Sequence, residues 1–155
     1  MMIISKIVKI LKTRIVIALL SSIILFWSCW YPAFELNYQN EIVEGAYCFV
    51  FGWLGLVCCI DCPWNLIWLA NPIYILSMFF FVFLDGKKSQ NIALILCLCS
   101  IAIGLSFFFC TSLCTSESGS PSDVGTLCIG YYLWILSFLV LLIGILLHRC
   151  VNEDT

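Results

Sequence analysis

Residues 87–110 read KKSQNIALILCLCSIAIGLSFFFC. After two lysines and three polar residues, the stretch continues through 19 residues (92–110) that carry no charge. A helix needs about 20 predominantly apolar residues to cross the roughly 30 Å hydrocarbon layer of a bilayer, because it rises about 1.5 Å per residue. Backbone groups find no water there and must bond within the segment. The stretch therefore predicts one transmembrane helix.

Three other segments share this character, at residues 15–30, 66–84 and 127–148. The whole chain of 155 residues is 63% hydrophobic and 10% charged, whereas soluble domains carry about 25% charged residues. The sequence predicts an all-α membrane protein that forms one domain over residues 1–155. Its four transmembrane helices are expected at about 14–31, 65–84, 91–110 and 127–148.

The charged residues divide between the two sides that this architecture creates. The seven basic residues all flank the spans on one side: Lys6, Lys9, Lys12, Arg14, Lys87, Lys88 and Arg149. The connections on the other side hold acidic residues and no basic ones: Glu35, Glu41, Glu44, Asp61, Glu117 and Asp123. Because positively charged flanks stay in the cytoplasm, we expect both termini there (N-in/C-in). The membrane is expected to be a bacterial inner (plasma) membrane. The chain is then expected to interact first with the lipid bilayer. It has no basic patch, so we do not expect it to bind nucleic acid.

Residues 46–60, AYCFVFGWLGLVCCI, are apolar but short. If they crossed the membrane, Lys87 and Lys88 would lie outside or the termini would lie on opposite sides. Gly52 and Gly55 also weaken a helix. We therefore expect a re-entrant or interfacial helix before the second span, with Trp53 at interfacial depth. A five-span architecture is the alternative.

The basic start and apolar run of the first span also resemble a signal peptide. Cleavage there, or lipoprotein processing at Cys29, requires small residues before the site. Phe26 and Trp27 do not meet this requirement. We expect the first span to be retained.

The spans offer packing features rather than ionisable groups, which argues against a pump. Asn71-Pro72 predicts a kink in the second span, with the Asn amide free to bond to a neighbouring helix. His148 is interpreted as an interface residue. Small side chains allow close helix packing and predict contact faces at Ala18, Ser22, Ser100, Gly104, Gly130, Ser137 and Gly144. Whether one face serves a homo-oligomer is left open.

Eleven cysteines are the most specific chemistry in the chain. Eight belong to the outer half on this topology, where an oxidising compartment allows pairing. Six of these are candidates for structural disulfides: Cys58, Cys59, Cys62, Cys110, Cys114 and Cys128. No metal site is expected, because the single histidine, His148, lies on the other side.

Cys59-Ile-Asp-Cys62 before the second span, with Cys110, Cys114 and Cys128 around the second outer connection, resembles the quinone-linked, disulfide-generating membrane oxidoreductases. The resemblance implies that Cys59 and Cys62 pass electrons to quinone, and that Cys110 with Cys114 or Cys128 meets a partner dithiol. That family has an arginine shortly after its C-x-x-C, whereas Pro63-Trp64-Asn65 follows here.

A second resemblance covers more of the chain. FGWLG at 51–55 followed by WLANP at 68–72 is similar to small bacterial multi-pass membrane proteins of unassigned function. In them a glycine-rich apolar segment precedes a span with Asn-Pro. The resemblance implies a re-entrant segment at 46–60 and no particular activity.

Three functions are consistent with these observations. The first is a non-enzymatic binding or accessory component without a cofactor, of the size and layout of toxin-immunity proteins and phage-defence membrane partners. It would recognise a membrane or periplasmic protein within lipid or through residues 32–64 and 111–126. The second is the quinone-using thiol-disulfide oxidoreductase, and the third is an oligomeric pore.

Overall fold

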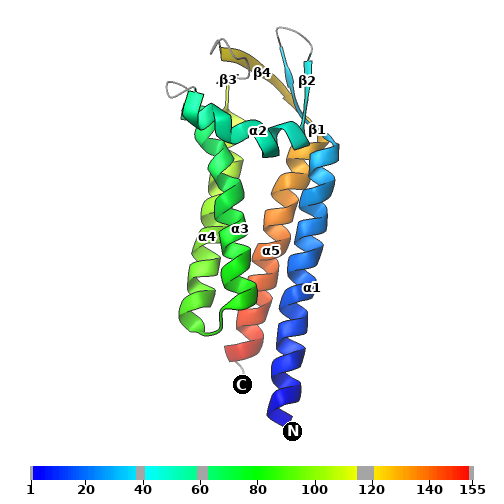
Figure 1. Cartoon of the computed structure of the whole chain (residues 1–155), viewed down its shortest axis with the longest axis vertical. Coiled ribbons are helices and arrows are strands. Elements are labelled where there is room, and N and C mark those ends of the chain that lie inside the picture. Colours follow the sequence, from blue (N-terminus) through cyan, green and yellow to red (C-terminus); the bar gives the residue numbers. More distant parts are fainter. Residues whose placement is uncertain (1, 38–40, 59–62, 115–120, 154–155) are drawn as a thin grey trace.

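Four long helices lie side by side in the computed structural model, which describes residues 2–37, 41–58, 63–114 and 121–153 (Figure 1). They are α1 (Met2–Trp30), α3 (Ala70–Phe83), α4 (Lys87–Ser106) and α5 (Ile129–Glu153). The 3₁₀ helix η1 (Pro63–Leu69) leads into α3, and η2 (Phe107–Phe109) follows α4. Both termini lie at the same end as the α3–α4 turn, which we call the terminal end. The opposite end, the sheet end, carries all the strands.

The four helical segments are long and apolar enough to cross a membrane. They run over Lys12–Trp30, Asn65–Phe83, Lys87–Phe109 and Ile129–Cys150. The prediction of four such helices is therefore confirmed. The largest difference in a boundary is at the third segment, which was expected to begin at 91 and begins at 87.

The helix α2 (Gly45–Cys58) crosses the sheet end of the bundle instead of running along it (Figure 1). Its 14 residues are too few to span a bilayer. Gly45 packs directly on α1, because a Cβ there would lie 3.1 Å from the Cα of Cys29. Gly52 faces the indole ring of Trp68, whose Nε1 donates to the backbone oxygen of Phe49 at 3.1 Å. Two glycines that weaken the helix intrinsically thus give it close contacts with η1 and α1.

The all-α prediction is wrong at the sheet end. Four strands form one antiparallel sheet in the order β2-β1-β4-β3. The strands are β1 (Pro32–Leu36), β2 (Glu41–Glu44), β3 (Ser112–Cys114) and β4 (Pro121–Leu127). The central pair joins the two connections, with Phe34 opposite Leu127 and Leu36 opposite Val124. Burial of Phe34 and Leu36 against this distant partner favours a sheet over loops.

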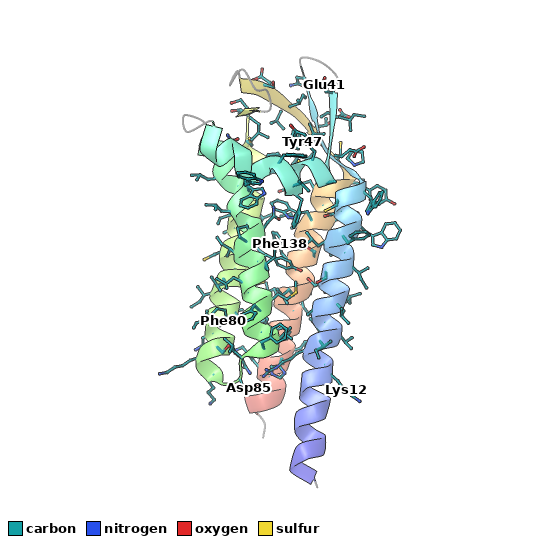
Figure 2. The ribbon with its side chains drawn as sticks, viewed as in Figure 1. Lys12, Glu41, Tyr47, Phe80, Asp85 and Phe138 are labelled. Carbon is teal, nitrogen blue, oxygen red and sulfur yellow. The ribbon has the colours of Figure 1, made fainter. Side chains whose placement is uncertain are left out.

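The bundle has a filled centre and an apolar exterior. Tyr74, Phe81, Phe138, Leu141 and Ile145 are fully buried, and Figure 2 shows Phe138 between the helices. Large apolar side chains are exposed along the outside of the helices, including Leu19, Ile23, Ile95, Leu98 and Ile143. So extensive an exposed apolar surface is unusual for a soluble monomer and fits a surrounding of lipid.

Candidate functional site

Hydroxyl groups join three helices at the middle of the bundle. The hydroxyl of Ser21 on α1 donates to the backbone oxygen of Ser137 on α5 at 2.6 Å, and it also contacts the hydroxyl of Tyr74 on α3. All three residues are buried. In an apolar surrounding such bonds are retained, because their loss would leave polar groups without partners. This cluster therefore fixes the relative positions of α1, α3 and α5.

The Asn71-Pro72 pair lies at the start of a helix. Pro72 falls in the first turn of α3, directly after η1, where a missing backbone donor costs little. Asn71 is buried, and its Oδ1 accepts a hydrogen bond from Nε1 of Trp134 on α5 at 2.8 Å. The amide thus connects α3 with α5, and the kink expected at Asn71-Pro72 stays a prediction.

A charged cluster closes the terminal end of the bundle. Nε of Arg14 donates to Nε2 of His148 at 2.9 Å, and its Nη1 contacts Oδ1 of Asp85 at 2.7 Å. Arg14 is 4% exposed and His148 is 7% exposed, whereas the Asp85 side chain is 89% exposed. Figure 2 shows Asp85 at this end, near the turn between α3 and α4. His148 is buried and accepts a hydrogen bond from Arg14, so it takes part in the packing of this end, and its interpretation as a membrane-interface residue stays a prediction.

The small residues singled out in the sequence lie mostly on contact faces. A Cβ at Gly104 would lie 2.8 Å from Cδ1 of Ile135, and one at Gly130 would lie 2.6 Å from the backbone oxygen of Pro32. Gly144 packs against Ile17. Ala18, Ser100 and Ser137 are buried, and Ser22 is half-buried with its hydroxyl 3.5 Å from the sulfur of Met78.

The predicted cysteine sites are described only in part. Cys59 and Cys62 lie outside the described residues, and so do the side chains of Cys58 and Cys114. Cys110 is buried at the end of η2, with its sulfur 3.4 Å from the backbone oxygen of Ser112. Among the cysteines that the structure describes there is no disulfide. The six-cysteine pairing and the C-x-x-C site stay predictions.

Two described thiols outside the spans have raised pKa values. Burial raises the pKa of Cys48 to about 12, and the neighbouring Cys29 adds to the shift. Burial, together with Glu35, raises the pKa of Cys128. Because the thiolate is the reactive form, both environments oppose nucleophilic chemistry at these sulfurs. In the described part of the chain, no group of His, Cys, Asp and Glu is arranged to hold a metal ion.

The sheet end presents an acidic surface on ordered strands. Glu35 on β1, Glu41 and Glu44 on β2, and Asp123 on β4 are all exposed. Glu35 is also held in place, because its Oε2 accepts a hydrogen bond from Oγ1 of Thr126 at 2.6 Å. Figure 2 shows Glu41 at the extremity opposite Asp85. We call these four carboxylates the acidic platform.

No known protein family, curated protein or solved structure matches this chain. The two resemblances drawn from the sequence stay predictions.

Sequence reasoning identified the acidic residues but missed the strands that carry them. The signal available was the alternation of apolar and polar side chains over residues 34–36, Phe-Glu-Leu, in which Glu35 alone is polar. It also missed the Arg14–His148 contact, for which no local pattern exists.

Proposed function

We propose that the protein is a non-enzymatic binding or accessory component of a bacterial inner membrane. In this proposal the four helices span the bilayer, both termini lie in the cytoplasm, and the sheet end faces outward. This orientation puts all seven Lys and Arg on the cytoplasmic side. An immunity- or defence-type membrane partner is the class we favour.

The acidic platform is the observation that carries the proposal. Its carboxylates stand on paired strands, and the β1–β4 pairing connects them to two separate parts of the chain. A preformed surface loses less conformational entropy on binding than a flexible loop does. Its uniform charge favours a partner with a basic surface and repels an acidic one.

The interior of the bundle supports a scaffold role. Among the described residues, every buried side-chain nitrogen and oxygen has a hydrogen-bond partner. Tyr74, Phe138 and Leu141 fill the centre, so a pore would have to form between several copies. The oxidoreductase alternative needs a reactive thiolate, and the raised pKa of Cys128 gives it less support.

Site-specific photocrosslinking in living cells tests the recognition. A benzoylphenylalanine at Ile42, which is 58% exposed on β2, is expected to give one discrete adduct with a membrane or periplasmic protein. The same probe at Ile143, 55% exposed on α5, is the control and should give lipid-type or diffuse products. Charge reversal by Glu41→Lys with Asp123→Lys should abolish the discrete adduct. An adduct that persists in this variant, or its absence at Ile42, would contradict the proposal.

Amine labelling tests the orientation. All native lysines lie at the terminal end, so a membrane-impermeant succinimidyl ester should leave them unlabelled in spheroplasts and label them in inverted vesicles. The Glu41→Lys variant should be labelled in spheroplasts. Labelling of Lys87 in spheroplasts would overturn the orientation.

A further inference from the structure

A groove of about 590 Å³ lies between α1 and α2 at the sheet end. Its volume falls within the roughly 300–1,000 Å³ typical of small-molecule sites. Most of the lining is apolar and comes from the last turns of α1 and the first turns of α2. The residues that matter to the argument are Phe26, Cys29, Trp30, Glu44, Phe49 and Val50.

One side chain in the groove lining carries a charge. Glu44 ends β2, and the next residue, Gly45, begins α2 by donating its N–H to the backbone oxygen of Tyr31 at 3.0 Å. This bond, and the close packing of Gly45 on Cys29, hold the backbone next to Glu44 against the end of α1, and Glu44 is part of the groove lining. The nearest other charges on the same strands are also acidic, at Glu41 and Glu35. The seven basic residues all belong to the terminal-end parts of α1, α4 and α5.

Aromatic rings line the same groove as Glu44. Trp30 and Phe26 form an edge-to-face pair with ring centres 5.9 Å apart, and Phe49 adds a ring from α2. Ring faces attract ammonium and other organic cations, and the attraction strengthens where water is excluded. A phosphate would find no cationic partner here and would be repelled by Glu44. Ordinary phospholipids therefore do not fit, whereas an apolar molecule with a single positive charge does.

We propose that this groove is a binding site for a lipophilic monocation, such as a hydrophobic amine or quaternary ammonium compound that partitions into the membrane. Glu44 neutralises the cation, and the rings of Trp30 and Phe26 contact it. The apolar part of the bound molecule lies along Phe49 and Val50. The groove shares Glu44 with the acidic platform, but the inference does not depend on the proposed protein partner, because it involves neither Glu41 nor Asp123, whose charge reversal tests that partner.

Equilibrium dialysis of the purified full-length protein in a mild non-ionic detergent tests the site. Radiolabelled tetraphenylphosphonium is the probe, and tetraphenylborate is the matched anion of nearly the same size and shape. We expect saturable binding of one phosphonium per chain and no saturable binding of the borate. Equal binding of the two ions would reduce the effect to hydrophobic partitioning and overturn the proposal, as would the absence of saturable phosphonium binding.

Two glutamates on β2 provide a test variant and its matched control. Glu44→Gln should weaken phosphonium binding by roughly tenfold or more, because it removes the charge and keeps the shape. Glu41→Gln lies on the same strand but outside the groove lining, and binding should remain within about twofold of the wild type. Equal losses in both variants would indicate general attraction to an acidic surface and would contradict a built site. If Glu44→Gln misfolds by circular dichroism, Ala46→Trp, which fills the groove from α2, should abolish binding instead.

Cys29 supplies a readout that does not depend on affinity. It lines the groove and is half-buried, whereas Cys99 is exposed on α4, away from the groove. Saturating phosphonium should slow alkylation of Cys29 by N-ethylmaleimide at least roughly threefold, measured by peptide mass spectrometry, and leave Cys99 unchanged. Protection of neither cysteine, or of both equally, would contradict the assignment of the groove.

Discussion

Arg14 on α1 donates its Nε–H to Nε2 of His148 on α5 at 2.9 Å, across 134 positions of sequence. The contact joins the helices that contain the two ends of the described chain. The Arg14 side chain is 4% exposed. It also forms an ion pair with Asp85, which connects the turn between α3 and α4 to the same contact. A residue whose charge is expected to set the orientation thus also closes the bundle.

Removal of the histidine should destabilise the bundle more than removal of the carboxylate. His148→Leu is expected to lower the free energy of unfolding by about 2 kcal/mol, because a buried charged donor loses its acceptor. Asp85→Asn should cost less than about 1 kcal/mol, since that side chain is 89% exposed and water screens the pair. Thermal unfolding in detergent, followed by circular dichroism, measures both. Equal losses would contradict the prediction, because they would show that the buried hydrogen bond does not contribute more than the exposed salt bridge.

Two glycines should respond differently to the same added methyl group. At Gly130 a Cβ would lie 2.6 Å from the backbone oxygens of Tyr31 and Pro32, which cannot move without shifting the start of β1. Gly130→Ala should therefore cost about 1–3 kcal/mol. At Gly104 the obstacle is Cδ1 of Ile135 at 2.8 Å, the end of a flexible side chain, so Gly104→Ala should cost less than about 1 kcal/mol. The same unfolding measurement decides, and the reverse order would contradict the packing of α5 on β1.

Cys48 should be nearly unreactive in the folded protein. Its pKa is raised to about 12 because burial penalises the thiolate. A raised pKa lowers the thiolate fraction at any lower pH, so alkylation at pH 8 should be slow and should increase with pH beyond the range in which an ordinary thiol has already titrated. Alkylation rates from pH 7 to 10 in mild detergent, compared with the same chain in SDS, measure this. A Cys48 that reacts equally fast in both detergents would contradict its burial.

The helices could be predicted because their signal is local, whereas the sheet and the charged contact depend on distant residues. An uncharged run such as 92–110 identifies its helix whatever surrounds it. Phe34 and Leu36 become strand residues only by pairing with Leu127 and Val124. Arg14 and His148 were each expected at a membrane boundary, but no periodicity relates a residue on the first helix to one on the last.

The second outer connection, residues 111–126, offers the sharpest test of the sheet. The backbone N–H of Val124 donates to Thr111 at 3.0 Å, and that of Cys128 donates to Ala33 at 2.9 Å. The N–H of Asn37, which follows β1, donates to the backbone oxygen of Asp123 on β4 at 3.0 Å. Amides held in this way exchange only when the sheet opens, whereas loop amides exchange almost at once.

We expect hydrogen exchange of peptides covering 122–128 in detergent to be slowed at least about a hundredfold relative to the unfolded chain. Leu36→Asp should remove this protection by placing a charge at a buried position of β1, while peptides from the middle of α4 stay protected. Rapid exchange at 122–128 in the unmodified protein would mean that β4, which carries Asp123 and joins the two connections, is not a stable strand. The platform, and with it the argument for a preformed binding surface, would then be lost.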